Sequence, residues 1–305
     1  MQPQYGLRNK KRPVIIKWIS SEAEVGRMAG KVTLLDGATG TRLWEKAGDR
    51  SPVWAYNITR PDIVRELHAE YIEAGSEIIL TNTFCANAPM LKNTGFAVEE
   101  VVRAGVRIAK EAAFGKGAKV ALDAGPLAAR LASTGGVSRD EAAEIFAAQL
   151  GAGMKEKPDC IFLETFMDLE MISVALSQAK RHGAPVLCAM NFMRSGKTPA
   201  GDTVASIARR LEAEGAYAAG LNCSLGPDAA LPVIRQFAQN TGLPLIFKPN
   251  AGLPDKGGSA PFDAQAFAVG VREAVRVGAT LVGGCCGTDP SYIARLSEMR
   301  AELFS

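Results

Sequence analysis

Histidine is scarce in this 305-residue chain, which contains only His68 and His182. Both lie in stretches with helical periodicity, His182 at the end of its stretch beside Gly183, so we expect surface or capping roles for them. Neither follows a predicted strand, where catalytic side chains gather in many folds. A nucleophile pair of the Cys-His or Ser-His type therefore cannot be built from these histidines.

The chain also lacks long apolar runs, a nucleotide-binding fingerprint and a disulfide framework. No apolar stretch approaches the roughly 18–20 residues that a membrane helix needs, so no membrane partner is expected. The turn 37–41 has neither the G-x-G-x-x-G spacing nor the GK[ST] ending of phosphate-binding loops. Six cysteines in 305 residues are too few for a disulfide scaffold, which favours reduced thiols and a cytoplasmic location.

The net charge of +3 is concentrated at the start of the chain. Residues 1–31 contain seven basic and two acidic side chains, a charge of +5, so the remainder carries −2. The body of the protein therefore shows no basic character that would indicate a nucleic-acid partner. We interpret residues 1–30 as a basic N-terminal extension, since the apolar run 14–16 is too short for a signal peptide, and residues 31–305 as one domain.

Strand-like and helix-like segments alternate through that domain. Short apolar runs predict strands at 31–36, 77–80, 118–122, 160–163, 185–189, 217–221, 244–247 and 280–282. Helical periodicity between and after them predicts helices at 61–74, 98–114, 138–155, 168–181, 202–214, 228–240, 263–277 and 292–303. Ser138 and Glu141 form a predicted capping box, and Asp202 is expected to cap the fifth helix. Eight apolar strands alternating with eight helices, without a nucleotide fingerprint, predict a single-domain (β/α)8 TIM barrel.

Polar and thiol side chains recur where the predicted strands end. In a (β/α)8 barrel these ends converge on one face, which holds the active site. The residues at these positions are Asp36, Asn82, Glu164, Cys223, Asn250, Cys285 and Cys286. Cys160 and Cys188 fall inside strands and are expected in the core, while Cys85 lies beyond the second strand.

The adjacent pair Cys285-Cys286 stands between glycine pairs after the last strand. Neighbouring cysteines are too close for an unstrained disulfide with each other, and the simplest interpretation of them is as small buried hydrophobes. Cys223 ends the sixth strand at the same depth, however, so three thiols can converge across the mouth. Three thiolates with a fourth position open are typical of a catalytic Zn²⁺ site.

Such a zinc site favours one kind of chemistry. Three thiolates leave the ion a poor Lewis acid for water, but a fourth thiol would bind as a nucleophilic thiolate. Alkyl transfer to a substrate thiol is the reaction this predicts. Asp36 and Glu164 could hold an ammonium group, and the amides of the turn Gly37-Ala38-Thr39 could hold a carboxylate, so a small amino-acid thiol suits the site.

Six segments together resemble the homocysteine S-methyltransferase family, which includes the homocysteine module of cobalamin-dependent methionine synthase and betaine–homocysteine methyltransferase. The segments are LDGATGT at 35–41, TNTF at 81–84, ET at 164–165, GLNC at 220–223, PNAGLP at 249–254 and GGCCG at 283–287. The resemblance covers residues 31–303.

The resemblance implies a zinc-dependent methyltransferase that converts homocysteine to methionine. It implies that zinc is bound by Cys223, Cys285 and Cys286, with the homocysteine thiolate as fourth ligand. It places Asp36 and Glu164 at the amino group and Gly37 and Ala38 at the carboxylate. By the same resemblance Thr165 and Asn82 belong to the substrate site, and Asn222 orients the metal site.

The methyl donor stays open, because the loops 123–128 and 191–196 differ from those of methionine synthases. A small sulfonium or betaine is one donor class, and a methylcorrinoid carried by a separate protein is the other. The chain ends at Ser305 without a folate or cobalamin module, so a corrinoid would need that partner. A homo-oligomer is a further alternative to a monomer.

Three other functions compete with this one. The barrel could serve a corrinoid-linked demethylation system with a different donor or acceptor. It could bind zinc or a thiol without turnover, although the complete set of carboxylates and cysteines argues against that. It could be an aldolase, but Lys248, which ends the seventh strand, is followed by Pro249 and lies beside the thiols, so a role in the ligand loop is favoured over a Schiff base.

Overall fold

The computed structural model describes residues 32–128, 131, 136–252 and 261–304. The predicted basic extension at 1–30, Lys31 of the predicted first strand and the end of the PNAGLP motif lie outside these ranges. Residues 32–305 form one compact unit. Among the described residues, no helix is both long and apolar enough to cross a bilayer.

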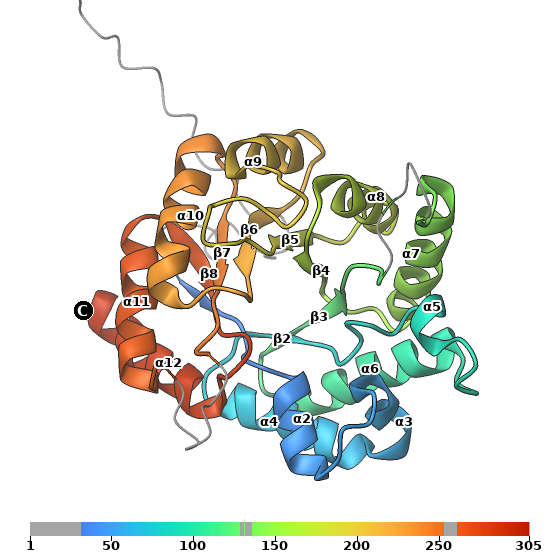
Figure 1. Ribbon diagram of the computed structural model, residues 1–305. Coiled ribbons are helices and arrows are strands. Elements are labelled where there is room, and N and C mark those ends of the chain that lie inside the picture. Colours follow the sequence, from blue (N-terminus) through green and yellow to red (C-terminus); the bar gives the residue numbers. More distant parts are fainter. Residues whose placement is uncertain (1–31, 129–130, 132–135, 253–260, 305) are drawn as a thin grey trace, which may run out of the picture. The chain divides into compact units, whose positions relative to one another are not determined.

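Eight parallel strands form the centre of this unit, in the sheet order β1-β8-β7-β6-β5-β4-β3-β2. A parallel bridge between Leu35 and Ile78 joins the two ends of that order, and the Glu77 amide donates to the Leu34 carbonyl at 2.8 Å. The ring is therefore closed, and the predicted (β/α)8 barrel is confirmed (Figure 1). The strands are β1 (Thr33–Leu34), β2 (Ile78–Leu80), β3 (Lys119–Ala124), β4 (Cys160–Phe166), β5 (Val186–Met190), β6 (Ala218–Asn222), β7 (Leu245–Lys248) and β8 (Ala279–Val282).

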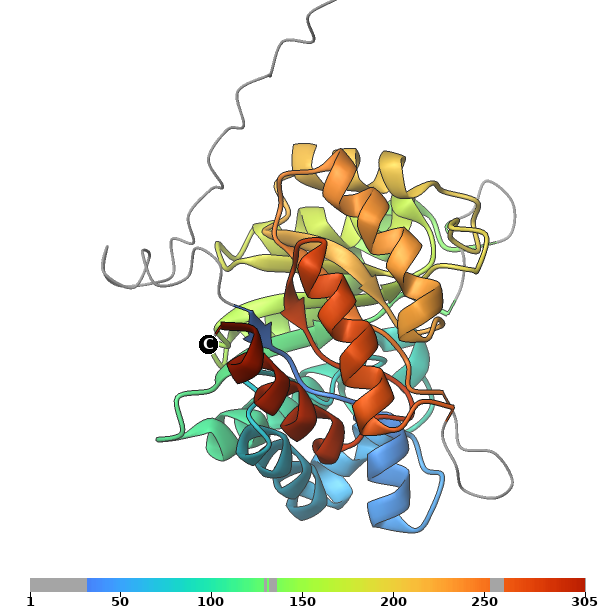
Figure 2. The same cartoon turned by 90° about the vertical axis from the view of Figure 1, so that its left-hand side faces the viewer.

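Helices surround the strands, and α10, α11 and α12 lie side by side in both views (Figures 1 and 2). The eight long helices confirm the predicted ones to within two residues at either end. They are α4 (Pro61–Glu73), α6 (Val98–Ala113), α7 (Arg139–Met154), α8 (Leu169–Lys180), α9 (Val204–Ala213), α10 (Pro227–Asn240), α11 (Ala264–Arg276) and α12 (Pro290–Phe304). The predicted capping box at Ser138 and Glu141 is present.

The segment between β1 and α6 holds additional short helices that the sequence pattern did not predict. They are α2 (Gly40–Ala47), the 3-10 turn η1 (Val53–Ala55), α3 (Tyr56–Thr59) and α5 (Ala88–Leu91). Each is too short to show a clear helical period. Trp54 and Tyr56 from this segment are buried, so tertiary packing holds these turns together.

Side chains alternate between the inside and the outside of each strand. In β3, Leu122 faces outward, because a Cβ added to Gly153 of α7 would lie 2.5 Å from its Cδ1. Asp123, the next residue, therefore faces the barrel interior. In β4, Phe162 faces inward, since the Nζ of Lys248 from β7 lies 5.5 Å from its ring centroid. Both Asp123 and Lys248 are thus directed into the barrel near its mouth.

The predicted cap of α9 is wrong. Thr203, not Asp202, caps α9, and its Oγ1 accepts from the Ser206 amide at 3.2 Å. Asp202 instead accepts from the Leu169 amide at 2.9 Å, which fastens the start of α8 to the loop after β5.

His68 is not a surface or capping residue, because its exposure is only 1%. It lies on the core-facing side of α4 with Val64 and Tyr71. Burial lowers its pKa to about 4, and the nearby charge of Asp36 only partly opposes this. His68 is therefore a neutral core residue. His182 is exposed at the end of α8, as predicted.

Candidate active site at the barrel mouth

Three cysteine sulfurs converge where β6 and β8 end. The Sγ atoms of Cys223, Cys285 and Cys286 all lie within 4.8 Å of one another, and those of Cys223 and Cys286 are 3.8 Å apart. All three thiols are free and partly accessible. Cys85, the other cysteine near the mouth, is outside this group, and burial raises its pKa to about 11. The described part of the chain contains this one cluster with metal-ligand geometry.

The backbone after β6 holds Cys223 in an unusual conformation. Cys223 and Ser224 have φ values of 61° and 59°, a left-handed region that costs non-glycine residues about 1–2 kcal/mol each. The Cys223 amide donates to the Lys248 carbonyl at 3.0 Å, and the Leu225 amide donates to the Cys223 carbonyl at 2.7 Å. These hydrogen bonds maintain the strained turn that directs the Cys223 thiol into the mouth.

The Cys285-Cys286 pair is held by the chain that follows β7. The Cys285 amide donates to the Pro249 carbonyl at 2.9 Å, and the Ala251 amide donates to the Cys286 carbonyl at 3.0 Å. Gly287 permits this approach: it has φ 82°, and a Cβ there would lie 1.7 Å from the carbonyl oxygen of Gly252. The glycine next to the cysteine pair is thus required by close backbone contact.

The three thiols share their protons unequally. The pKa of Cys223 is lowered because the thiols of Cys285 and Cys286 donate hydrogen bonds to its sulfur. In turn, the Cys223 sulfur raises the pKa of Cys286 to about 11 and raises that of Cys285 still further. One thiolate therefore forms readily and the other two do not, unless a cation compensates their charge.

A zinc ion fits this donor set. Around a tetrahedral zinc with Zn–S bonds of about 2.3 Å, sulfur atoms lie about 3.8 Å apart, and the Cys223–Cys286 separation is 3.8 Å. Three soft sulfur donors, with no fourth protein ligand among the described residues, are typical of a zinc site that keeps one position for an exogenous ligand.

A carboxyl cluster lies in the same mouth, where β1 and β4 end. It is close to the thiols on the β1 side, because β1 pairs with β8 and the Gly284 amide donates to the Asp36 carbonyl at 3.0 Å. Asp36 and Glu164 are both predicted site residues, and a buried lysine joins them. The Nζ of Lys248 lies 2.9 Å from Asp36 Oδ1 and 3.5 Å from Glu164 Oε1. Burial opposes the charge on Lys248, but the two carboxylates outweigh that effect and raise its pKa. The second oxygen of Asp36 accepts from the Leu80 amide at 2.7 Å.

Asn222 and Thr165 form a clamp between β6 and β4. The Thr165 amide donates to Asn222 Oδ1 at 2.8 Å, and Asn222 Nδ2 donates to Thr165 Oγ1 at 2.6 Å. Thr165 has φ 60° within a register shift of β4 between Leu163 and Phe166. Such bulges re-aim side chains beside active sites. Asn222 Nδ2 also lies 3.9 Å from Cys285 Sγ, so one side chain connects the carboxyl cluster to the sulfurs.

The remaining predicted residues lie at the same end of the barrel with their hydrogen bonds largely occupied. The Ala38 amide donates to Thr288 Oγ1 at 3.1 Å, and the Ala38 carbonyl accepts from Tyr71 at 2.8 Å. A Cβ on Gly37 would lie 2.7 Å from Thr288 Oγ1, so Gly37 packs against the same threonine. Asn82 donates to the Val53 carbonyl and to Asn57 Oδ1 at 2.7 and 2.9 Å, and its amide group supports the fold.

Two charged residues of the mouth were missed as site residues. Lys248 was expected in a ligand loop, but it is an internal counter-ion of Asp36 and Glu164. Asp123 was recognised only as part of a loop, yet it is buried in the interior with 4% exposure. Both residues stand at the last inward position of an apolar strand. This position could have indicated a site residue, because a buried charge needs a partner.

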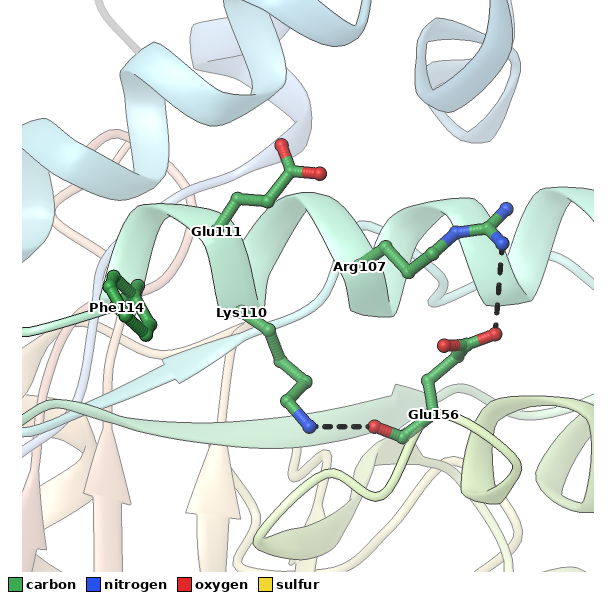
Figure 3. A pocket seen from close by; sticks show the side chains of 5 residues that line it. All are labelled: Arg107, Lys110, Glu111, Phe114 and Glu156. Carbon is green, nitrogen blue, oxygen red and sulfur yellow. Dashed lines mark hydrogen bonds and ion pairs between the residues drawn. The ribbon is translucent and has the colours of Figure 1, made fainter.

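A separate hollow of about 470 Å³ lies at the opposite ends of the strands, between α6 and the turn after α7 (Figure 3). In Figure 3, Arg107 and Lys110 point toward Glu156, whereas Glu111 points away. Arg107 pairs with the Glu156 carboxylate at 3.8 Å, and Lys110 donates to the Glu156 carbonyl at 2.8 Å. These are ordinary surface contacts that join α6 to α7.

Comparison with known proteins identifies the family of this chain. The family described as homocysteine S-methyltransferase matches residues 33–300. Methionine synthase from Mycobacterium leprae is 29% identical over 88% of this chain, and the match spans 24% of that protein. Betaine–homocysteine S-methyltransferase 1 from Mus musculus is 30% identical over 88% of this chain and 72% of its own length. The chain thus spans about a quarter of the methionine synthase and most of the betaine enzyme.

Solved structures show the same fold. The metallated form of the Escherichia coli homocysteine methyltransferase MmuM superposes with a TM-score of 0.79 at 21% identity, covering 91% of this chain and 99% of that one. Its apo form gives 0.72 at 22% identity, covering 88% and 96%. With a barrel of this kind, a cysteine triad typical of a zinc site and a family match over nearly the whole described chain, this protein belongs to the homocysteine S-methyltransferase family.

Proposed function

We propose that this chain transfers a methyl group to the thiolate of homocysteine and so forms methionine. The observation that carries the proposal is the convergence of three sulfurs, from the ends of β6 and β8, on one point of the barrel mouth. Cys223, Cys285 and Cys286 would hold Zn²⁺ there. When bound, zinc lowers the pKa of an added thiol, and three thiolate ligands keep that sulfur nucleophilic at neutral pH.

The protein's own residues would position the acceptor. The left-handed turn at Cys223 and the close approach of Gly287 to Gly252 fix the three sulfurs in advance, so little reorganisation accompanies binding. Asn222 is hydrogen-bonded to Thr165 and lies near Cys285 Sγ, so it would connect the carboxyl cluster to the sulfurs. An amino acid with a short thiol side chain would span the two groups, with its carboxylate near the turn at Gly37 and Ala38.

The identity of the methyl donor is the main question for experiment. Zinc-loaded protein would be incubated with homocysteine and, separately, S-methylmethionine, S-adenosylmethionine, betaine and methylcobalamin. Methionine formation would be measured by mass spectrometry. We expect one donor class to support turnover in the wild type and none to do so in Cys286→Ser.

The same donor experiment also tests the corrinoid alternative. If only a methylcorrinoid supports methionine formation, a separate corrinoid protein becomes the expected partner. Transfer of the methyl group from a corrinoid to another thiol, with homocysteine inactive as acceptor, would favour the demethylation system instead. Failure of every donor with a protein that holds zinc and binds homocysteine would favour a binding protein without turnover.

The cell compartment and the domain boundary belong to the same proposal. Free thiols that bind zinc must stay reduced, which supports a cytoplasmic location. We assign the catalytic domain to residues 31–305 and treat residues 1–30 as an extension outside it. Deletion of residues 1–30 should leave zinc content and acceptor binding unchanged.

A further inference from the structure

A buried lysine lies beside the two carboxylates that are expected to hold the acceptor's amino group. Lys248 ends β7, and its side chain is only 2% exposed. Its Nζ lies 2.9 Å from Asp36 Oδ1, 3.5 Å from Glu164 Oε1 and 5.5 Å from the ring centroid of Phe162. Because residues of the barrel interior enclose this ammonium group, it is a fixed part of the subsite.

The two carboxylates differ in how easily a ligand can reach them. The Asp36 side chain is 1% exposed, and its Oδ2 also accepts from the Leu80 amide at 2.7 Å. The Glu164 side chain is 14% exposed, so an ammonium group that enters the mouth meets Glu164 first. Each carboxylate oxygen can accept two hydrogen bonds, and Lys248 therefore leaves acceptor capacity on both residues.

The charge of this subsite suits one additional cation. Asp36 and Glu164 contribute two negative charges, and Lys248 compensates one of them. Asp123, the neighbouring carboxyl group at the end of β3, is buried, and its Oδ1 has no hydrogen-bond partner in the described part of the chain. Burial, and then the charge of Glu164, raise the pKa of Asp123 well above its ordinary value, so it is a neutral group. One negative charge remains for a ligand.

Loss of Lys248 would alter more than the charge of the subsite. Burial raises the pKa of Glu164, and the charge of Lys248 is the strongest effect in the opposite direction. Without Lys248, two like charges would face each other in a poorly solvated space, and one of them would take up a proton or turn away. A neutral or displaced carboxyl group holds an ammonium group less well than a carboxylate in place.

Building on the proposed function, we infer that Lys248 is a positioning residue for the acceptor's amino group. It holds Asp36 and Glu164 next to each other and reduces their joint charge to the amount that one ammonium group balances. The amino group would bind both carboxylates from the open side of the mouth, with Lys248 on the buried side. Lys248 thereby helps to select an amino-acid thiol over a thiol of the same length without an amino group.

Binding measurements test this without knowledge of the methyl donor. Homocysteine and 4-mercaptobutyrate, which has the same chain and carboxylate but no amino group, would be titrated calorimetrically into zinc-loaded wild type and Lys248→Met. We expect Lys248→Met to weaken homocysteine binding about 10- to 100-fold, the range of one charge-assisted hydrogen bond. Binding of 4-mercaptobutyrate should change less than about threefold, because it offers no ammonium group to the carboxylates.

A second pair of variants keeps the test decisive if Lys248→Met does not fold. In Glu164→Gln, Lys248 compensates the whole charge of Asp36, so the preference for homocysteine over 4-mercaptobutyrate should disappear. In the double variant Glu164→Gln with Lys248→Met, Asp36 regains its uncompensated charge, and the preference should return by about tenfold. Loss of Lys248 thus lowers the preference in the wild type and raises it in Glu164→Gln, a reversal that a purely structural lysine would not produce.

Lys46→Met is the matched control for the loss of a lysine. Lys46 also joins two carboxylates, those of Glu66 and Glu70, but it lies outside the cysteine and carboxyl clusters. Its substitution should leave the affinities for both thiols unchanged. The zinc content of every variant would be measured before titration, so that a loss of metal is not mistaken for a loss of amino-group recognition.

Four outcomes would contradict the inference, and they can be told apart. Equal weakening of both thiols by Lys248→Met, or no return of the preference in the double variant, would make Lys248 a structural residue. Tighter homocysteine binding by Lys248→Met would make it a competitor of the amino group. Equal affinity of the wild type for both thiols would mean that the mouth does not recognise the amino group, while zinc-dependent thiol binding would still stand. Binding of neither thiol by zinc-loaded wild type would overturn the proposed function itself.

Discussion

Two clusters in the barrel mouth, the three thiols and the carboxyl groups, balance their charge in different ways. In the first cluster, three thiols from the ends of β6 and β8 lie within 4.8 Å of one another. In the second cluster, Asp36 and Glu164 share Lys248, a cation that the chain supplies itself. The carboxyl cluster thus has a cation within the folded chain, whereas three thiolates would need an added ion to compensate their charge.

The largest effect should come from the thiol cluster. Cys285→Ser removes one of three ligands, so the purified protein should lose most of the roughly one zinc per chain expected for the wild type. Metal content would be measured by mass spectrometry after dialysis. Cys85→Ser is the matched control, since this thiol lies near the mouth but outside the triad, and normal zinc in Cys285→Ser would refute the assigned ligand set.

Removal of the internal cation should produce the next largest effect. Lys248→Met leaves buried Asp36 and half-buried Glu164 without their partner, and we expect the free energy of unfolding to fall by about 3–5 kcal/mol. Urea titration at neutral pH measures this.

Lys46 offers a matched control for that variant. Its Nζ also joins two carboxylates, Glu66 at 3.0 Å and Glu70 at 2.7 Å, but the glutamates are 60% and 33% exposed. Lys46→Met should therefore cost less than about 1 kcal/mol. Equal losses of unfolding free energy in Lys248→Met and Lys46→Met would show that burial does not strengthen the Lys248 ion pairs.

His68 should make the stability of the folded protein depend on pH. Burial lowers its pKa to about 4 in the folded protein, below the value of about 6.5 in an unfolded chain. Its contribution to stability is therefore complete above pH 6.5 and is lost as the pH falls toward 4. At pH 5 the loss should be about 2 kcal/mol.

Urea titrations at pH 7 and pH 5 test this contribution. His68→Leu should remove about 2 kcal/mol of the pH-dependent loss, and His182→Gln, which changes an exposed side chain, should retain it. An unchanged pH dependence in His68→Leu would contradict the assignment of a neutral buried histidine.

The smallest effect concerns the connection between the two clusters. Asn222→Ala removes both hydrogen bonds to Thr165 and should lower the free energy of unfolding by about 1–2 kcal/mol. Thr165→Gly relaxes the left-handed conformation at φ 60°, so Asn222→Ala should cost less in that background. Additive losses in the double variant would argue that the clamp does not maintain the strained residue.

The barrel and the cysteine triad could be predicted because their signals are local. Apolar runs and helical periods marked each strand and long helix, and cysteines at two strand ends had to meet once the barrel closed. The short helices α2, η1, α3 and α5 were missed because each is too short to show a period. His68 was misplaced although it stands four residues after buried Val64 and three before buried Tyr71, the spacing of the same helical face.

The balance of charge could not be predicted from the same signals. The position of Lys248 at a strand end did not reveal that its Nζ reaches Asp36, 212 residues away in the chain. Nor could the sequence show that both oxygens of Asp36 are taken while one of Asp123 has no partner. Such pairings depend on which inward positions become neighbours across the barrel, and this requires three-dimensional distances.

X-ray absorption at the zinc edge tests the ligand set and the acceptor together. Zinc-loaded wild type should show three sulfur neighbours at about 2.3 Å, and a fourth should appear when homocysteine is added. Fewer than three sulfur neighbours, or a spectrum that homocysteine leaves unchanged, would contradict a site built by Cys223, Cys285 and Cys286 to bind a substrate thiol.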